Sequence, residues 1–459
     1  MPQHPHLVIF NPDQWRGDVL GHMGHPATVT PNLDRAVQTD MVSFRNAFCQ
    51  NPVCTPSRCS FMTGWYPHTR GHRTMFHMLQ PDEPMLLKTL KDAGYFVWWG
   101  GKNDVVPAQN GYEAYCNVKY EAPNTTERPL RANLHADLSW RGEPDSDNYY
   151  SFYAGRLEKS ADEPYVYDGD WAMVEGAIEA IRTHPADQPL CIYLPLSDPH
   201  PPYGVEDPWY SAIDRNALPP RIPSPTEWTG KPSLLKGIAE RQNLTGWDEA
   251  RWNELRATYY GMCSRVDHQF GLIQQALRDA GIYDDTAIFF FSDHGDFTGD
   301  YGLVEKTQNT FEDCLTRVPF LIKPPVGFPV KPRVSDALVE LIDFPATVEA
   351  ITGIGPHHTH FGRSLLPLLA GETDTHRDAV FCQGGRLKDE SQAKELESTP
   401  HAPELSLYWP RLILQRGDGP EHTKAVMCRT LDYKYVYRLD EPDEFYDLRT
   451  DPGEQHNAV

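Results

Sequence analysis

Short apolar runs without polar alternation constrain the fold of this chain more than any other feature. Segments with helical periodicity separate these runs through the first two thirds of the chain. A strand that is apolar throughout needs cover on both faces, which is typical of a parallel sheet between helices. The predicted strands are Leu7–Phe10, Val42–Phe48, Tyr95–Trp99, Leu190–Leu196 and Ala287–Phe291. We therefore expect an α/β fold in which helices sandwich a large, mostly parallel sheet.

The pattern changes near the C-terminus. Four short runs there are typical of antiparallel strands, namely Ala379–Cys382, Arg411–Leu414, Ala425–Cys428 and Tyr433–Tyr437. The sequence therefore predicts an N-terminal catalytic domain over residues 1–375 and a smaller subdomain over residues 376–459. The polar, proline-rich segments 121–168 and 203–246 are expected to be insertions that face a substrate.

Charge and composition exclude some classes of protein. The net charge is −22 and no cluster of Lys and Arg is present, so we expect no nucleic-acid partner. No run of about 20 apolar residues occurs, so we expect no membrane span. The apolar run Leu7–Phe10 is too short for a signal peptide, and the nine cysteines are an odd number. These features favour a cytoplasmic protein; a periplasmic or secreted location stays open if the sequence is a trimmed form.

A cysteine motif indicates the chemistry. Cys54-Thr55-Pro56-Ser57-Arg58, followed by Thr63-Gly64, resembles the signature of type I sulfatases in the alkaline phosphatase superfamily. The resemblance implies an alkaline-phosphatase-like fold and a maturation enzyme that oxidises Cys54 to formylglycine. The hydrated aldehyde would attack the sulfur of a sulfate ester, and its second hydroxyl would then expel the sulfate. Arg58 lies one helical turn later, where it would hold the nucleophile or an anionic oxygen.

Two acidic motifs indicate a metal site. Asp13-Gln14 and Asp293-His294 directly follow predicted strands, and ligands gather at the carboxyl ends of strands in such sheets. Carboxylate and amide oxygens suit Ca²⁺ or Mg²⁺, whereas a histidine suits Mn²⁺ better. The resemblance implies metal ligands at these four residues together with Cys54. We expect Ca²⁺, with Mg²⁺ or Mn²⁺ as alternatives.

Three further residues match catalytic positions of the same family. Lys102 closes the segment Tyr95 to Lys102, which resembles the second sulfatase signature and its sulfate-binding lysine. His200 follows a predicted strand and resembles the family histidine that contacts the sulfate and protonates the leaving oxygen. Lys306 resembles the lysine that follows the late metal motif. Together with Arg58 and the metal, the two lysines would clamp an anionic transition state.

Substrate-binding residues are less sharply indicated. His72 and Arg73 belong to a basic segment after Cys54 that would bind a second anionic group or form a polar helix exit. Asp104 stands where the family usually has a histidine that touches the formylglycine hydroxyl. It either replaces that histidine or lies outside the site.

The sequence therefore predicts a formylglycine-dependent sulfatase that acts on a carbohydrate or aryl sulfate, and it leaves open whether the protein is a monomer or a homo-oligomer. One alternative is a phosphonate monoester or phosphodiester hydrolase of the same superfamily, which Asp13-Gln14-Trp15-Arg16 and Asp293-His294 resemble. Another is an inactive homologue that binds sulfated glycans, which the missing histidine after Lys102 motivates.

Overall fold

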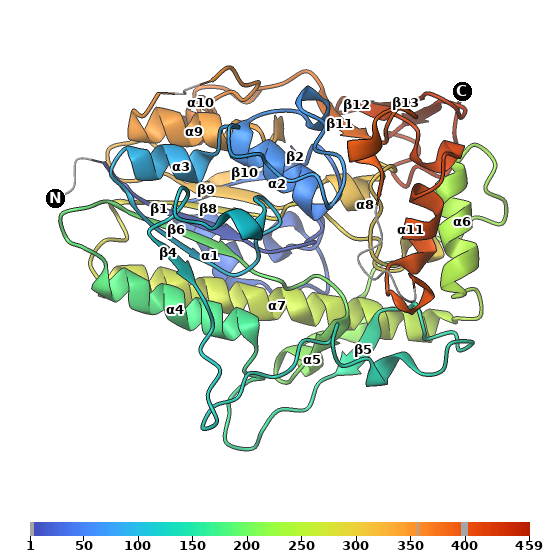
Figure 1. The fold of residues 1–459 in the computed structure, drawn as a ribbon, viewed down its shortest axis with the longest axis horizontal. Coiled ribbons are helices and arrows are strands. Elements are labelled where there is room, and N and C mark those ends of the chain that lie inside the picture. Colours follow the sequence, from blue (N-terminus) through green and yellow to red (C-terminus); the bar gives the residue numbers. More distant parts are fainter. Residues whose placement is uncertain (1–3, 356–357, 396–402) are drawn as a thin grey trace.

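An eight-stranded sheet runs through the molecule between two layers of helices (Figure 1). The structure is a computed structural model that describes residues 4–355, 358–395 and 403–459. The strand order is β10 (Arg333–Glu340), β2 (Val42–Phe48), β9 (Phe320–Lys323), β8 (Thr286–Phe291), β1 (His6–Asn11), β6 (Leu190–Pro195), β3 (Phe96–Gly100) and β4 (Val118–Tyr120). The five strands predicted from apolar runs are all present, within one or two residues at either end.

The sheet is mostly parallel, as predicted. Within the described residues β9 runs antiparallel to both of its neighbours, β2 and β8, and the other neighbouring pairs are parallel. Parallel strands need crossover connections, usually through a helix. α4 (Gly169–Thr183) supplies one between β3 and β6, and α7 (Glu249–Asp279) connects β6 to β8. The parallel strands therefore present their carboxyl ends along one edge of the sheet.

Alternate residues of the central strands fill two separate cores. Val8 and Phe10 of β1 pack into the core on the side of α7, where the Phe10 ring lies 5.3 Å from Phe270. Leu7 and Ile9 pack into the core on the opposite face with Leu87. Each fully buried side chain of this size contributes about 1.5–3 kcal/mol relative to exposure. Burial on both faces explains why the strand sequences do not alternate.

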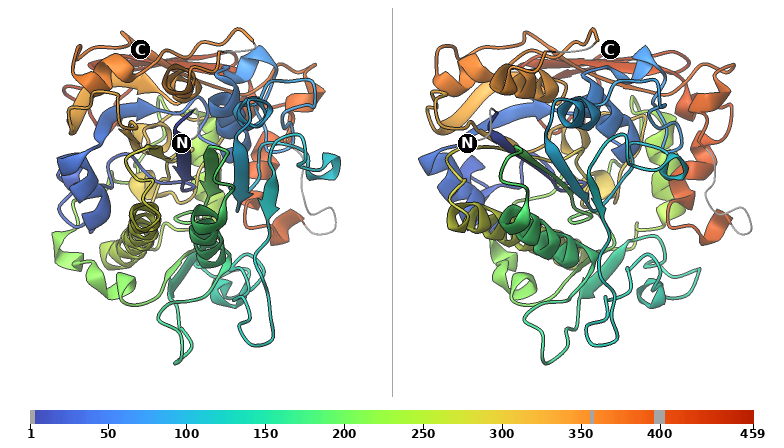
Figure 2. Two further views of the ribbon diagram at one scale, coloured as in Figure 1. Left: turned by 90° about the vertical axis from the view of Figure 1, so that its left-hand side faces the viewer. Right: turned by 60° about the vertical axis from the view of Figure 1, so that its left-hand side comes forward.

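The helices divide between the two faces, as the rotated views show (Figure 2). α1 (Pro31–Thr39), α4 and α7 cover one face. α2 (Cys54–Thr63), α3 (Leu86–Asp92), α9 (Asp343–Thr352) and α10 (Leu366–Ala370) cover the other. The remaining helices are α5 (Trp209–Ala212), α6 (Ser233–Gln242), α8 (Asp313–Thr316) and α11 (Trp409–Gln415). In the described part of the chain, no helix has both the length and the apolar character needed to cross a bilayer.

A second, antiparallel sheet forms near the C-terminus, as predicted, but one of its predicted strands is wrong. Its strands are β11 (Val380–Gly384), β12 (Ala425–Arg429), β13 (Tyr433–Arg438) and β14 (Glu444–Asp447). The segment Arg411–Leu414 lies in α11 instead of a strand. Its apolar run is too short to distinguish a period of two from 3.6 residues, and Pro410 stands in the first helical turn, where proline is tolerated.

The two predicted insertions contact one another and the long helix. The first contains β5 (Tyr153–Arg156), which pairs in parallel with β7 (Tyr203–Val205) at the start of the second. Both strands pack against α7. The second insertion also contains α5 and α6, and α6 packs against α11. The insertions and the C-terminal part of the chain thus meet on the same flank of the molecule (Figure 1).

Candidate active site

Five parallel strands deliver reactive side chains to one edge of the large sheet. The strand ends are followed within a few residues by acidic, basic, imidazole and thiol groups. These groups are Asp13 after β1, Cys54 after β2, Lys102 after β3, His200 after β6, and Asp293 with His294 after β8. Residues far apart in the chain therefore meet because parallel strands end on the same side.

Cys54 is the first residue of α2 and lies at the centre of this group. Its Sγ atom is 3.2 Å from Nε2 of His294, 3.5 Å from Nζ of Lys102 and 3.6 Å from Oδ1 of Asp13. The side chain is 1% exposed. Burial, followed by the charge of Asp13, raises the pKa of the Cys54 thiol to about 12. The unmodified side chain is therefore a neutral thiol at neutral pH, which is a weak nucleophile.

Arg58 joins the two buried aspartates. Its Nη2 atom lies 2.8 Å from Oδ2 of Asp13, and its Nε atom donates to Oδ2 of Asp293 at 2.9 Å. All three side chains are fully buried. Burial alone would raise the pKa of Asp13, but Lys102 and Arg58 outweigh it and hold this pKa well below its usual range. Arg58 thus makes a charge-assisted hydrogen bond to each aspartate, and all three side chains are buried.

Asp13, Cys54, Asp293 and His294 form a group of possible metal ligands. One ligand atom from each lies within 4.8 Å of the others. The Nδ1 atom of His294 is 3.0 Å from the carbonyl oxygen of Gly295, so the proton on Nδ1 leaves Nε2 with a free lone pair. Burial lowers the pKa of His294, which favours this neutral form. Two carboxylates and a neutral imidazole nitrogen fit a divalent cation.

Lys306 connects Gln14 to His200. Its Nζ atom donates to Oε1 of Gln14 at 2.6 Å and lies 2.8 Å from Nε2 of His200. Nδ1 of His200 is 2.5 Å from the carbonyl oxygen of Pro201, so Nε2 accepts the lysine proton. Burial, then Lys306 and Lys102, lowers the pKa of His200 well below its ordinary value. Gln14, predicted as a metal ligand, therefore directs its amide oxygen to Lys306.

Asp104 lies within the site, beside Lys102. Lys102 Nζ is 3.1 Å from Oδ2 of Asp104 and 2.7 Å from Oδ2 of Asp13. Asp104 has a φ of 47°, a conformation that costs free energy for a non-glycine residue. The side chain of Lys102 is 23% exposed, so this lysine lies on the open side of the group.

His72 and Arg73 have carboxylate partners of their own. Nε2 of His72 is 3.0 Å from Oε2 of Glu83. Arg73 makes two charge-assisted hydrogen bonds to Glu390, at 2.8 and 2.9 Å, and is 1% exposed. The segment follows the end of α2 at Gly64 rather than belonging to a helix. Both side chains are thus paired internally rather than presented to a ligand.

Sequence reasoning missed a polar group that supports the site. Oδ2 of Asp296 accepts from Nε2 of Gln14 at 2.5 Å, and its Oδ1 accepts from the hydroxyl of Tyr203 at 2.8 Å. Burial raises the pKa of Asp296 to about 6. Its position three residues after Asp293 was a usable signal, whereas Tyr203 lies in an insertion with no motif around it.

Three rings from separate segments lie at the open side of the buried group. The His135 ring centroid is 5.6 Å from that of His200 and 6.1 Å from that of Tyr408. All three rings are partly exposed, whereas Cys54 and Lys306 are buried. His135 comes from the first insertion and Tyr408 immediately precedes α11. The sequence carries no signal that these rings meet, because the segments are far apart in the chain.

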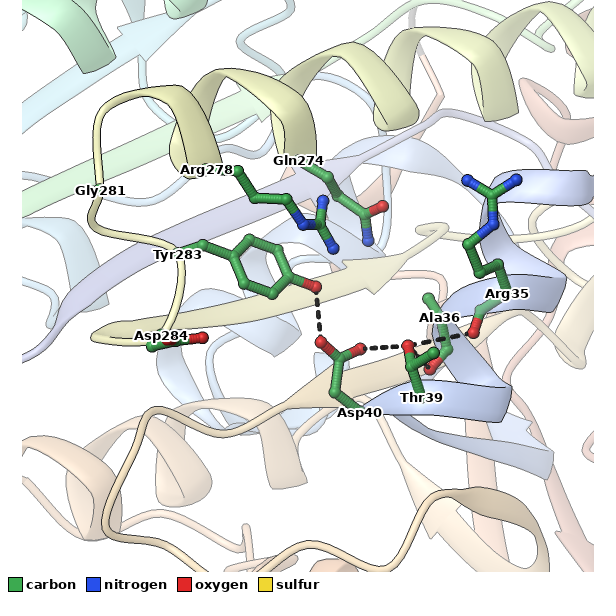
Figure 3. Close-up of a pocket in the computed structure, with 9 residues that line it drawn as sticks. All are labelled: Arg35, Ala36, Thr39, Asp40, Gln274, Arg278, Gly281, Tyr283 and Asp284. Carbon is green, nitrogen blue, oxygen red and sulfur yellow. Dashed lines mark hydrogen bonds between the residues drawn. The ribbon is translucent and has the colours of Figure 1, made fainter.

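A surface hollow of about 420 Å³ lies at the other end of the sheet (Figure 3). Tyr283 and Asp284 line it just before β8 begins, whereas Asp293 follows the end of that strand. The Tyr283 hydroxyl donates to Oδ2 of Asp40 at 2.7 Å, and Arg278 stacks 3.7 Å from the Tyr283 ring centroid. The hollow thus lies at the strand end opposite the catalytic group.

Comparison with known proteins agrees with this arrangement. The Ulvan-active sulfatase of Formosa agariphila is 25% identical over 462 residues, which cover 100% of this chain and 78% of that protein. The phosphonate monoester hydrolase of Agrobacterium radiobacter superposes with a TM-score of 0.74 at 23% identity and covers 99% of this chain and 91% of its own. A protein solved with its substrate D-glucosamine-2-N,6-O-disulfate superposes with a TM-score of 0.67 at 18% identity, covering 99% and 93%.

The family assignment rests on a match along most of the chain. The protein-family model described as Sulfatase matches residues 5–354. This range contains the cysteine motif, both acidic motifs and all three predicted catalytic cations. The chain therefore belongs to the sulfatase family, within the alkaline phosphatase superfamily.

Proposed function

We propose that this protein hydrolyses sulfate monoesters, with Cys54 converted to formylglycine as the source of the nucleophile. The observation that carries the proposal is the position of the Cys54 Sγ atom, which lies within 3.6 Å of Asp13, His294 and Lys102. An oxygen on the same carbon would lie between possible metal ligands and an ammonium group. Family membership supports the same chemistry.

The modified residue would supply a hydrated aldehyde, whose two hydroxyls attack sulfur and afterwards release the sulfate. Lys102 Nζ lies 3.5 Å from Sγ, where it stabilises negative charge on an attacking oxygen. Arg58 holds Asp13 and Asp293 in position through its two hydrogen bonds. These contacts orient the nucleophile before substrate arrives.

A divalent cation would be held by Asp13, Asp293 and His294, with Cys54 after modification beside it. Bound there, it would polarise the sulfate oxygens and lower the pKa of a coordinated hydroxyl. Ca²⁺, Mg²⁺ and Mn²⁺ all accept the two carboxylates, and the imidazole nitrogen favours Mn²⁺ among them. Gln14 Nε2 donates to Asp296, which fixes the side chain next to Asp13.

Lys306 and His200 form the proton donor for the leaving group. Lys306 holds a proton at Nζ, 2.8 Å from the lone pair on Nε2 of His200. A departing alkoxide next to Lys306 and His200 receives the proton from Lys306. It then leaves as the neutral alcohol, which is a better leaving group. Lys306 and Lys102 also bind the sulfate oxygens from two sides. At short range their positive charge outweighs the repulsion between the anionic substrate and the negative net charge of the protein.

The first test measures turnover and modification in the same preparation. We expect protein co-expressed with a formylglycine-generating enzyme to cleave an aryl sulfate faster than the matched phenylphosphonate monoester. In the tryptic peptide Asn46–Arg58, Cys54 should lose one sulfur and two hydrogens and gain one oxygen. Activity should disappear with EDTA and return with Ca²⁺ or Mn²⁺.

Three results of that test would contradict the proposal. Faster cleavage of the phosphonate ester would favour the phosphonate hydrolase alternative. Binding of a sulfated glycan without product, despite modified Cys54, would favour the inactive homologue. Full activity after removal of all divalent metal would mean that the reaction does not use the proposed metal site.

Gly101 tests whether the position of Lys102 matters for turnover. Gly101 has a φ of 103°, and a Cβ atom there would lie 2.1 Å from the carbonyl oxygen of Pro195. That oxygen also accepts the Lys102 N–H at 3.0 Å. We expect Gly101→Ala to lower kcat/KM by roughly tenfold or more, because small displacements of catalytic groups are costly. Initial rates on an aryl sulfate measure this effect.

Gly94→Ala is the matched control. Gly94 has a φ of 97°, but its Cβ would meet no atom within 4 Å. Alanine at position 94 therefore adds backbone strain of about 1–3 kcal/mol but causes no clash. Similar turnover of the two variants would show that the approach of Gly101 to Pro195 does not position Lys102.

A further inference from the structure

We propose that His135 and Tyr408 bind the alcohol part of the ester, and that this part is an uncharged ring such as a phenol or a pyranose without a second acidic group. This inference rests on the proposed function and adds the substrate class to it. The structural basis is the three-ring wall formed by His135, His200 and Tyr408.

The wall lies on the leaving-group side of the site. His200 is the ring that accepts the Lys306 proton, and its centroid is 5.6 Å from His135 and 6.4 Å from Tyr408. Lys306 Nζ lies 6.0 Å from the Tyr408 ring centroid. An ester that places its leaving oxygen next to His200 therefore brings its alcohol against the other two rings.

The wall is preformed. Nδ1 of His200 donates to the carbonyl oxygen of Pro201 at 2.5 Å, and the His135 ring packs against the ring fixed in this way, at 5.6 Å between centroids. Tyr408 packs 5.7 Å from the buried ring of Phe152, centroid to centroid. A rigid wall loses little side-chain entropy when a ligand binds, so its ring faces contribute fully to affinity.

The rings offer polar groups as well as flat faces. A neutral imidazole has one nitrogen that donates and one that accepts, so the His135 ring offers both functions. The Tyr408 hydroxyl makes no hydrogen bond to any residue that the structure describes. Both groups can therefore pair with hydroxyls of a sugar or a phenol, in addition to stacking on its ring.

The wall is uncharged, which excludes a second anion. Burial, followed by Lys102 and Lys306, lowers the pKa of His135 to about 4, so its ring is neutral at neutral pH. Burial raises the pKa of Tyr408, which keeps its hydroxyl protonated. A second sulfate or carboxylate on the alcohol would lose hydration without gaining a counter-ion from these rings.

The cations around the wall already have anionic partners. Arg411 stacks on Tyr408 but pairs with Glu305 at 3.0 Å, and Lys306 pairs with the same carboxylate at 2.9 Å. Arg73, predicted from sequence to bind a second anion, pairs with Glu390. Arg411, Lys306 and Arg73 thus each have a carboxylate partner within the protein.

A matched pair of substrates tests the charge preference. 3-Carbamoylphenyl sulfate and 3-carboxyphenyl sulfate have the same shape and differ by one negative charge on the alcohol. We expect the wild-type protein to show a kcat/KM at least tenfold higher for the carbamoyl ester. Equal values, or a preference for the carboxy ester, would overturn the neutral-ring assignment.

Substitutions test the residues. We expect His135→Ala and Tyr408→Leu each to raise KM for the carbamoyl ester about five- to tenfold and to leave the inhibition constant of inorganic sulfate within about twofold. Tyr408→Leu keeps an apolar side chain against Phe152, which protects the fold. The control is Tyr437→Ala, at an exposed position of β13 (48% exposed), which should leave both constants unchanged.

Two outcomes would overturn the role of the wall. An unchanged KM in both variants would mean that the rings do not contact the alcohol. An inhibition constant for sulfate that rises as much as KM would mean that they hold the anion site instead.

If wild-type protein cleaves no sulfate ester, the same variants are measured on 3-carbamoylphenyl phenylphosphonate, which carries the same alcohol. A raised KM there supports the wall while the sulfate assignment fails; an unchanged KM refutes both.

Discussion

Replacing Cys54 with alanine is expected to lower kcat/KM by roughly 10³-fold or more, because it removes the thiol group whose oxidation would produce the aldehyde. The substitution removes one buried sulfur and leaves the charged groups around it in place. Arg58 still pairs with Asp13 and Asp293. Binding of inorganic sulfate as a product inhibitor should therefore persist while turnover is lost. Rates on an aryl sulfate and the thermal midpoint of the variant measure the two properties separately.

Cys59→Ala is the matched control for this experiment. Cys59 lies on the same helix, is 1% exposed, and has its Sγ atom 4.0 Å from the carbonyl oxygen of Val105. Its loss creates a similar small cavity, so the two variants should have similar stability. Turnover of Cys59→Ala should remain within about threefold of the wild type. Retained turnover of purified Cys54→Ala would eliminate the formylglycine mechanism.

Arg58→Met is expected to destabilise the metal-free protein by about 3–5 kcal/mol, because it leaves buried carboxylates without their countercharge. Asp13 and Asp293 are fully buried on either side of the guanidinium. Methionine matches much of the arginine volume but donates no hydrogen bond. Denaturant titration in EDTA measures the free energy of unfolding. A decrease in the free energy of unfolding of less than about 1 kcal/mol would mean that Lys102 alone balances the negative charge of the two carboxylates.

A divalent metal should recover part of the lost stability of Arg58→Met. A cation between Asp13, Asp293 and His294 binds the native state and not the unfolded chain, so it stabilises the fold by mass action. Recovery with Ca²⁺ or Mn²⁺ but not with Na⁺ would support the metal site. The control is Arg449→Met, whose partner Asp447 lies at the surface and whose own side chain is 53% exposed. This variant should change the free energy of unfolding by no more than about 0.5 kcal/mol.

The central strands and the strand-end residues could be predicted because both depend on short stretches of sequence. A run such as Leu7–Phe10 has to be buried on both faces wherever it lies in the fold. Asp13 and Asp293 follow such runs directly, and the carboxyl ends of parallel strands meet at one edge. Cys54, Lys102 and Lys306 were found through resemblance to family motifs. The structure brings all of these side chains together.

Predictions that needed contacts between distant segments were weaker. Arg411–Leu414 was predicted as a strand, yet it forms part of α11, where Arg411 pairs with Glu305. Gln14 was predicted as a metal ligand, and this stays a prediction; its amide oxygen accepts from Lys306, a contact that the sequence did not indicate. The basic segment around Arg73 was predicted either to bind a second anion or to form a polar helix exit, and the structure pairs Arg73 with Glu390. In each case the partner lies more than 100 residues away along the chain.

The sequence by itself determined the fold class and the chemistry of the anion site, because strand burial and the family motifs are both local patterns. Only the tertiary structure decided which cations are free to act and what lies beside the leaving group. Side-chain pairing depends on distances of a few ångströms between segments that the loops bring together. The wall illustrates the point: the sequence singled out His200 but neither His135 nor Tyr408, and the three rings meet only in the folded chain.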